Sequence, residues 1–289
     1  MSRMQARMLP DGRRLHLSDG PIDLIVGADG DANEVQRALD VARIRCSTVL
    51  DELCTELPLL RQPAERLPEG AVARRMWRAT IGFATETFIT PMAAVAGAVA
   101  EEILYAMVTA ASLDRAHVNN GGDIALHLGP WQSYRIGLVD RPDNPSLFSR
   151  AQIRWNDGVR GIATSGWRGR SLSFGIADSV TVLAANASAA DAAATLIANA
   201  VDLPGHPVVT RVKAVDLQPD SDLGQRLVTR GVGPLNPDDI DLALSRGMEL
   251  ACAMTARQTI MACALHLAGQ TRTVGEVPVE LRRSLVIHA

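Results

Sequence analysis

The chain has 289 residues, of which 47% are hydrophobic and only 3% aromatic, so a sizeable core must be built mainly from aliphatic side chains. A net charge of −3 and a pI near 6.1 argue against a general nucleic-acid-binding protein. The first 20 residues lack the apolar run of a secretory segment, and the longest charge-free apolar tract, residues 87–100, is shorter than a membrane span of ~20 residues. We therefore expect a cytoplasmic protein that binds neither nucleic acid nor membrane.

The first predicted elements are two short strands at residues 14–17 and 22–26, joined by a turn. Residues 31–60 carry apolar side chains at helical spacing, which predicts one long amphipathic helix or two joined helices. Residues 63–70 contain Pro63, Pro68 and Gly70 and are typical of a linker. We expect a single domain over residues 1–289, with a sub-division near this linker as the alternative.

A helix is predicted to begin at Thr90 and Pro91, with the threonine as the cap and the proline in the first helical position. It continues over residues 92–109 through alanine and glycine, which allow another backbone to pack close to it. Glu101 and Glu102 are adjacent and therefore point in different directions, so we interpret them as a solvated helix face rather than a paired acid/base site.

Three short strands are predicted at residues 116–120, 123–128 and 133–140, and their glycine-rich turns are typical of an antiparallel meander. Asn119, Asn120 and Asp123 flank the Gly121-Gly122 turn and could hold the polar edge of a ligand. Asparagine and glycine are also the residues that a tight turn requires, so a purely structural role is the alternative.

The polar pattern that most resembles a site lies in residues 161–202. Thr164-Ser165-Gly166, followed by Arg168 and Arg170, predicts a tight loop whose backbone N–H groups and guanidinium groups could bind an anion. Trp167 should lie at the wall or rim of that pocket. The Gly121-Gly122 turn and this loop should converge on it, because each is a strand-end turn with free amides.

A buried strand is predicted at residues 179–185, followed by a helix at residues 188–201. Asp191 and Thr195 lie four residues apart on one face of this helix, where a carboxylate and a hydroxyl could both bind a hard cation such as Mg²⁺. The alternative is that Ser188 caps the helix and Asp191 reaches back to it, as in a capping box.

Further along, residues 208–215 predict a strand and residues 237–267 a helical region, in which His266 is interpreted as a core histidine. The cysteines Cys46, Cys54, Cys252 and Cys263 have no metal-binding spacing and are expected to be buried free thiols in helices. The predicted fold class is α+β, with mainly antiparallel sheets layered with long helices.

Four motifs resemble, in this order, motifs of the ApbE-like superfamily of T-fold proteins, whose best-known members are FAD:protein FMN transferases. They are Val118 to Ile124, Thr164-Ser165-Gly166, the strand Ser179 to Val182, and Ala190-Asp191 with Thr195. The resemblance covers roughly residues 90–202 and is closest to a shorter, uncharacterised UPF-type branch. It implies that Asp191 and Thr195 bind Mg²⁺.

The resemblance also implies a phosphorylated small-molecule ligand, with FAD or FMN as the cofactor. The expected cofactor-binding residues are those of the two glycine turns and the arginines beside them: Asn120, Gly121, Gly122, Asp123, Thr164, Ser165, Gly166, Arg168 and Arg170. No residue is assigned a catalytic role. The chain departs from the transferases in the short segment 167–175, which lacks their histidine, and at Ala100 and Glu101, where they carry a lysine.

Three functions follow from these observations. The first is a metal-dependent enzyme, a flavin or nucleotidyl transferase, acting on a flavin nucleotide or another phosphorylated ligand. The second is a binding protein that keeps the pocket without transferase chemistry, which the two departures favour. The third is a structural protein whose alanine- and glycine-rich helices pack in a homo-oligomer.

Overall fold

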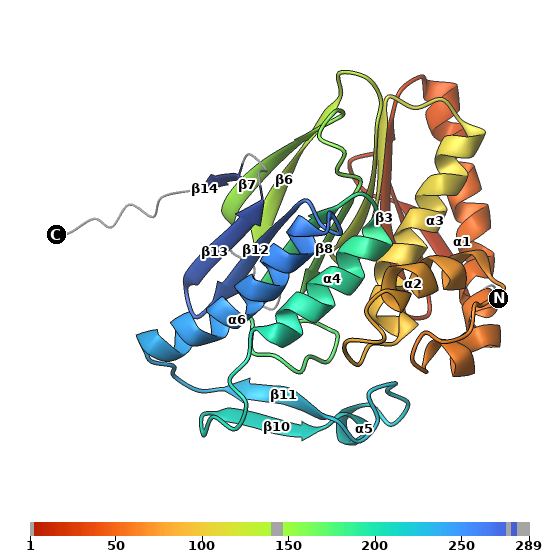
Figure 1. Cartoon of the computed structure of the whole chain (residues 1–289). Helices are drawn as coiled ribbons and strands as arrows, with labels where there is room; N and C mark the ends of the chain where they lie inside the picture. The colour runs from red at the N-terminus through yellow and green to blue at the C-terminus, as the bar shows by residue number, and fades with distance from the viewer. Residues whose placement is uncertain (1–2, 140–146, 276–278, 282–289) are drawn as a thin grey trace.

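The computed structural model describes residues 3–139, 147–275 and 279–281, and all strand pairs in these residues are antiparallel. The main sheet has nine strands in the order β1-β2-β3-β4-β5-β8-β9-β12-β13 (Figure 1). Their bounds are β1 Gln5–Met8, β2 Arg14–Asp19, β3 Ile22–Asp29, β4 Arg115–Asn120, β5 Asp123–Leu128, β8 Gly161–Ser165, β9 Ser179–Ala184, β12 Ala262–Leu267 and β13 Gln270–Gly275.

Two smaller sheets accompany the main one. The first has the order β14-β7-β6, and the second pairs β10 with β11 in an arm that extends from the lower end of the molecule (Figure 1). Their bounds are β6 Ser133–Val139, β7 Leu147–Arg154, β14 Val279–Leu281, β10 Val209–Lys213 and β11 Leu227–Val232.

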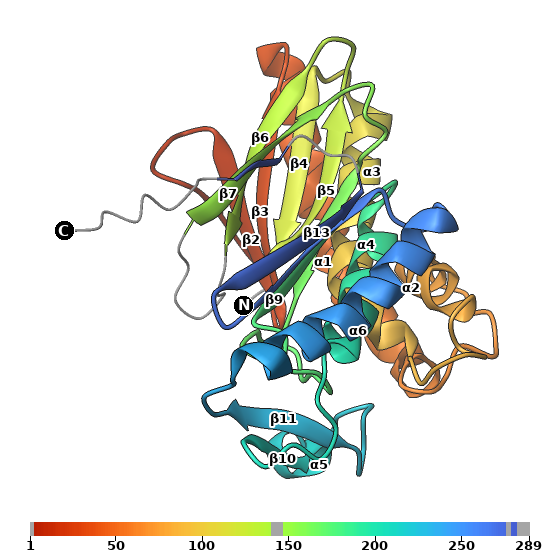
Figure 2. The ribbon, with the colours of Figure 1, turned by 60° about the vertical axis from the view of Figure 1, so that its left-hand side comes forward.

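Four long helices lie side by side on one face of the main sheet, in the order α1, α3, α4 and α6 (Figures 1 and 2). The helix α2 packs on α3 and α4 from outside, and α5 belongs to the arm. The helices are α1 Ala32–Leu60, α2 Ala71–Ile81, the 3-10 turn η1 Pro91–Ala94, α3 Val95–Ala110, α4 Ala187–Ala200, α5 Ala214–Leu217 and α6 Pro237–Ala256. The predicted α+β class of antiparallel sheets and long helices is confirmed.

The main hydrophobic core fills the space between this helical layer and the sheet. In β2 and β3 the buried positions alternate with more accessible ones, so that one face of the strands packs on the helices. A smaller core on the opposite face of the sheet includes Leu126, Ile162 and Leu183 and packs against Tyr134 and Ile136 of β6 (Figure 2). The main sheet is therefore covered on both faces around β5 and β8, where the glycine turns lie.

Most of the predicted elements are present. The first hairpin is formed by β2 and β3, and residues 32–60 form one helix rather than two, capped by Asp31, which accepts from the N–H groups of Asn33 and Glu34. The predicted strand at residues 179–185 corresponds to β9, all of whose residues are buried. The sequence did not predict the strands β1, β7, β8, β11, β13 and β14 or the helices α2 and α5.

Two predictions from the sequence are wrong, a strand pairing and the end of a helix, and a third, the cap at Thr90, is correct in position but not in its hydrogen bond. The strand β6 pairs with β7 and not with β5, so the proposed meander ends after β5. Residues 262–267 form the fully buried strand β12, because a short apolar run fits a buried strand as well as a helix. Thr90 makes no capping bond; its hydroxyl contacts the Asp222 carboxylate at 2.5 Å instead. Asp140, the last residue of the third predicted strand, lies outside the described residues.

The cysteines and His266 differ from the expectation in part. Cys46 and Cys263 are buried, but Cys54 and Cys252 are exposed, and Cys263 lies in a strand. All four thiols are free. His266 is buried, as expected, and its Nδ1 lies 2.8 Å from the hydroxyl of Thr271, but it belongs to β12 and not to a helix.

The segment Pro91–Ala110 is the one helix in the described residues that is long and apolar enough to cross a membrane by composition, although no such segment was expected. Half of it is buried within the protein, and it packs between α1 and α4 against β4 and β5. Central helices of protein cores have the same composition, so this segment is weak evidence for a membrane span.

Candidate functional site

A cavity of about 1200 Å³ lies between the C-terminal half of α1, the η1–α3 segment, the β4–β5 turn and the end of β8. All the site residues expected from the sequence line it: Asn120, Gly121, Gly122, Asp123, Thr164, Ser165, Gly166, Arg168, Arg170, Asp191 and Thr195. The structure thus places the two glycine turns and the face of α4 with Asp191 and Thr195 around one cavity. Whether these residues bind a cofactor or a metal stays a prediction.

The β4–β5 turn is fixed by local hydrogen bonds. Gly121 and Gly122 have φ angles of +67° and +120°, which glycine adopts without strain. The side chain of Asn119 accepts from the N–H of Gly122 at 2.9 Å, and the amide of Asn120 donates to the carbonyl of Ala96 at 3.1 Å. Both asparagines therefore have the structural role that the turn requires, and Asn120 also ties the turn to α3.

Thr164 and Ser165 belong to the end of β8, so the predicted loop begins only at Gly166. The N–H of Thr164 donates to Asp123 at 3.2 Å, and its hydroxyl lies 2.9 Å from that of Thr181 on β9. These contacts fix the Asp123 carboxylate between the β4–β5 turn and β8. Extended backbone rather than loop backbone forms this wall, because both residues pair with β9.

Two carboxylates face the cavity with strongly perturbed acidity. Burial raises the pKa of Asp123 from 3.8 to about 7, against the opposing effects of the Thr164 N–H and the Arg170 charge. Burial, and then the negative charge of Asp123, raise the pKa of Asp191 well above its ordinary value. In the described residues neither carboxylate forms an ion pair with an arginine, lysine or histidine within 4.0 Å. This part of the cavity is therefore a place where a cation would be stabilised.

Asp191 does not belong to a capping box. The cap of α4 is Asn186, whose side chain accepts from the N–H of Ala189 at 2.9 Å, and the Ser188 hydroxyl lies within hydrogen-bond distance of both Asn186, at 3.0 Å, and Glu101, at 2.9 Å. Asp191 instead accepts from the N–H of Gly97 at 2.9 Å, in the first turn of α3. The sequence could not show this, because the acceptor and the helix it caps are far apart in the chain.

The predicted anion-binding arginines have different surroundings. The Nε of Arg168 donates to Asp178 at 2.7 Å, and its guanidinium stacks on Trp167 at 4.2 Å from the ring centre. A guanidinium nitrogen of Arg170 lies 2.8 Å from where a Cβ on Gly121 would be, so the missing side chain at Gly121 leaves room for it. Trp167 does not line the cavity, in contrast to the expectation.

The opposite part of the cavity is aliphatic. Residues of α1 and α3 form this wall: Leu50, Leu53, Leu57, Leu60, Val95 and Val99. The sequence predicted only an amphipathic helix for α1, because a helix face that lines a cavity has the same periodicity as one that packs against protein. Among the residues that the structure describes, no phenylalanine, tyrosine or tryptophan lines the cavity.

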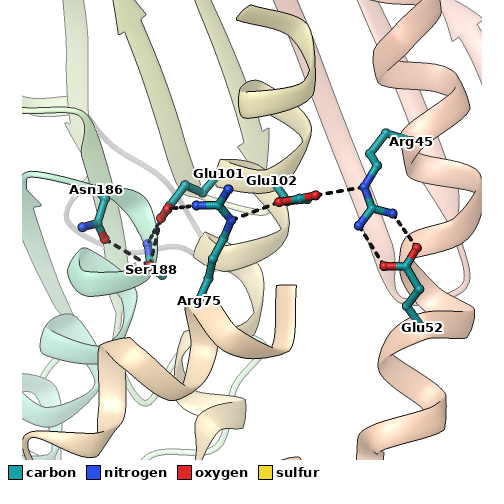
Figure 3. Close-up of polar contacts among 7 residues, drawn as sticks. All are labelled: Arg45, Glu52, Arg75, Glu101, Glu102, Asn186 and Ser188. Carbon is teal, nitrogen blue, oxygen red and sulfur yellow. Dashed lines mark hydrogen bonds and ion pairs between the residues drawn. The ribbon is translucent and has the colours of Figure 1, made fainter. Parts of the chain in front are cut away.

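Glu101 and Glu102 do not form a solvated helix face. Glu102 is buried and binds the Nε of Arg45 at 3.0 Å and that of Arg75 at 3.1 Å (Figure 3). Glu101 binds the other side of the Arg75 guanidinium at 2.5 Å and accepts from the hydroxyl of Ser188 at 2.9 Å. Adjacent helix positions point in different directions, so one glutamate faces α1 and the other faces α4, and α2 supplies the arginine between them.

The donor set fits a divalent cation that keeps part of its water shell. Carboxylate and hydroxyl oxygens of Asp123, Asp191 and Thr195 are the hard ligands that Mg²⁺ prefers. In the described residues no group of three or more His, Cys, Asp or Glu side chains could enclose a metal. An open site completed by water and ligand phosphate oxygens is the arrangement that suits these residues.

A family model and several curated relatives match this chain. The family model described as AbpE bacteria matches residues 6–273. A UPF0280 protein of Methanosarcina acetivorans is 31% identical over 209 residues, covering 66% of this chain and 74% of that protein. A UPF0280 protein of Methanopyrus kandleri is 43% identical over 137 residues, covering 46% of this chain and 52% of that protein. The chain spans about half the length of the first curated relatives it matches.

Among solved structures, the apo form of the flavinyl transferase ApbE of Pseudomonas stutzeri matches with a TM-score of 0.44 and 13% sequence identity. The match covers 95% of this chain and 93% of that one. A flavin transferase ApbE from Vibrio cholerae matches with a TM-score of 0.35 and 12% identity, covering 94% of this chain and 96% of that one.

Proposed function

This chain belongs to the family described as AbpE bacteria, and from that premise we propose that its cavity binds a flavin nucleotide, or a phosphorylated small molecule of similar size, together with a divalent cation. The observation that carries the proposal is the pair of half-buried carboxylates, Asp123 and Asp191, whose charges are not balanced by an ion pair in the described residues. The resemblance of the sequence to the ApbE-like superfamily supports Mg²⁺ as that cation.

The electrostatics of the cavity support a metal between protein and ligand. In their ionised forms Asp123 and Asp191 repel a phosphate group, so a phosphorylated ligand then needs a cation beside them. When bound, Mg²⁺ would supply positive charge to phosphate oxygens, and Asp191, Thr195 and Asp123 would hold it. Arg170 would add a second positive charge near the β4–β5 turn.

The shape and composition of the cavity support a ligand with an apolar body. Its volume, about 1200 Å³, exceeds the usual range of ~300–1,000 Å³ for small-molecule sites. The aliphatic wall of α1 and α3 offers apolar surface to a ring system, while the two glycine turns offer backbone N–H groups. A flavin nucleotide has both parts, an apolar ring and a phosphorylated chain.

The first experiment measures binding with and without metal. FAD, FMN and ATP are titrated into the wild type and into Asp191→Asn, each with magnesium and with chelator. We expect the wild type to bind a flavin nucleotide in magnesium, and Asp191→Asn to lower this affinity at least tenfold, or about 1.4 kcal/mol. Absorbance of a flavin in the purified protein would be an independent sign of binding. Equal affinities in all four conditions would contradict the proposal.

A non-catalytic binding protein is the second candidate, and one observation favours it. The position where the transferases carry a lysine holds Ala100 and Glu101 here, and both oxygens of Glu101 contact other parts of the protein. Incubation with FAD and magnesium separates the candidates. A transferase breaks the pyrophosphate bond of FAD, releases AMP and passes the FMN group to water or to an acceptor hydroxyl, whereas a binding protein returns FAD unchanged. We also propose a cytoplasmic homo-oligomer, which light scattering of the purified protein and fractionation of cells would test.

A further inference from the structure

The crossing of α3 and α4 determines where Asp191 lies in the cavity. Gly97 is the point of closest approach: a Cβ there would lie 2.3 Å from the carbonyl oxygen of Ala187. Backbone therefore touches backbone without an intervening side chain, and the position of α4 depends directly on that of α3. Any change in this crossing moves Asp191 relative to the β4–β5 turn.

Two carboxylates form hydrogen bonds near this close approach, each with the N-terminal part of the other helix. Asp191 of α4 accepts from the N–H of Gly97 at 2.9 Å, in the first turn of α3. Glu101 of α3 accepts from the N–H of Ser188 at 3.3 Å and from its hydroxyl at 2.9 Å, in the first turn of α4. The two helices thus cap each other, and neither relies on its own sequence alone for these N–H groups.

The spacing explains why one residue on each helix can do this. Gly97 and Glu101 are four residues apart on α3, and Ser188 and Asp191 are three apart on α4, so each pair lies on one helix face. Arg75 of α2 holds the other oxygen of Glu101 at 2.5 Å, which fixes the direction of the carboxylate (Figure 3). Arg75 thus fixes the Glu101 carboxylate, and Glu101 in turn fixes the first turn of α4.

From this geometry we infer that Glu101 is a positioning residue for the ligand site: it holds the first turn of α4 against α3 and thereby places Asp191 in the cavity. The inference rests on the proposed function, because it assigns Glu101 to the metal-binding role of Asp191. Glu101 itself does not line the cavity. Its effect on binding must therefore pass through α4.

Glu102 provides a matched control. It is the neighbour of Glu101, shares Arg75 with it and is more deeply buried, but its partners Arg45 and Arg75 belong to α1 and α2. Glu101→Gln and Glu102→Gln each remove one negative charge from the same network. Only Glu101→Gln weakens the contact with α4.

The first measurement is magnesium-dependent FAD binding at a temperature where all variants are folded. We expect Glu101→Gln to lower the affinity at least fivefold and Glu102→Gln to lower it less than twofold. The double variant Glu101→Gln/Asp191→Asn should bind within twofold of Asp191→Asn alone, because Glu101 acts through Asp191. Equal losses in the two glutamine variants, or additive losses in the double variant, would overturn the inference.

The second measurement needs no ligand and separates this inference from the proposed function. Amide hydrogen exchange reports the Gly97 N–H, which donates to Asp191. We expect Glu101→Gln to accelerate exchange of this amide at least tenfold and Glu102→Gln less than threefold. If wild type binds no nucleotide, the proposed function is contradicted. If the Gly97 amide of Glu101→Gln exchanges at the wild-type rate, the positioning role of Glu101 is contradicted, whatever the binding result. Should Glu101→Gln not fold, Ser188→Ala, which removes only the hydroxyl donor, replaces it in both measurements.

Discussion

Two groups of carboxylates lie near α3, and they differ in whether arginine side chains balance their negative charge. Glu101 and Glu102 are bound by Arg45 and Arg75, so their charges are balanced within the fold. Asp123 and Asp191 receive backbone N–H groups instead of cationic side chains, and burial raises their pKa values despite these hydrogen bonds. A balanced buried network stabilises one arrangement of helices, whereas unbalanced acids at a cavity are typical of sites that bind cations or protons. The difference separates a structural cluster from a candidate site.

The largest expected effect is on stability, in the cluster where Arg45 and Arg75 balance the charges of Glu101 and Glu102. Glu102→Ala leaves Arg45 and Arg75 without their shared partner and should lower the free energy of unfolding by about 3 kcal/mol. Urea denaturation measures this. The folded variant should keep magnesium-dependent FAD binding within twofold, since Glu102 does not line the cavity. A variant of wild-type stability would show that the cluster is not structural.

Gly97→Ala tests whether the two clusters are coupled through the crossing of α3 and α4. A Cβ at Gly97 would lie 2.3 Å from the Ala187 carbonyl oxygen, so the helices must separate, at a cost of about 2 kcal/mol of stability. Because Asp191 accepts from Gly97, nucleotide affinity should fall as well.

The matched control for this change is Gly82→Ala. A Cβ at Gly82 meets no atom within 4 Å, and its φ of −65° suits alanine. This variant should have wild-type stability within about 0.5 kcal/mol and unchanged affinity. Both effects are read from thermal unfolding and FAD titration. A Gly97→Ala protein with wild-type values in both would show that the crossing tolerates a methyl group.

The pH dependence of binding tests the role of Asp123 and Asp191, which have no ion-pair partner in the described residues. A cation binds the ionised carboxylates, and the pKa of Asp123 is raised to about 7, so protons compete with the metal below pH 7. Because the pKa of Asp191 is raised as well, magnesium-dependent affinity should rise at least tenfold per pH unit as pH increases towards 7, a change of at least about 1.4 kcal/mol. Titrations at pH 5.5, 6.5 and 7.5 measure it.

Without metal, the sign for stability is the opposite. The folded-state pKa of Asp123 is above its ordinary value of 3.8, so the folded protein binds more protons between about pH 4 and 7. The free energy of unfolding of the metal-free protein should therefore fall progressively as pH rises through that window. Asp123→Asn should remove this fall. An affinity independent of pH in wild type would show that Asp123 is already ionised.

The smallest expected effect concerns the cap of α4. Asn186→Ala removes the acceptor of the Ala189 N–H and should lower stability by about 1 kcal/mol. Asn236→Ala removes the equivalent cap of α6 and should lower stability by the same amount. Only Asn186 contacts Ser188, which binds Glu101, so only Asn186→Ala should also weaken FAD binding, by about twofold or 0.4 kcal/mol. Thermal unfolding and titration of both variants decide this.

Local patterns in the sequence were sufficient for much of the fold. Periodicity located α1, α4 and the hairpin of β2 and β3, because the spacing of apolar residues within one element determines which face is buried. The glycine pairs located the turns, since a positive φ at Gly121 and Gly122 is a property of these residues themselves. The family resemblance then selected Asp191 and Thr195, which do line the cavity.

The tertiary structure alone decided how the elements use their side chains. The sequence predicted that Glu101 and Glu102 form a solvated helix face. In the folded protein they contact Arg45 of α1, Arg75 of α2 and Ser188 of α4. For Asp191 the sequence left a local cap as the alternative to cation binding, but its N–H donor is on another helix. The apolar stripe of α1 lines a cavity in part, and residues 262–267 became a strand between β9 and β13. Burial, charge pairing and pKa depend on neighbours distant in the chain, and no local pattern records which neighbours those are.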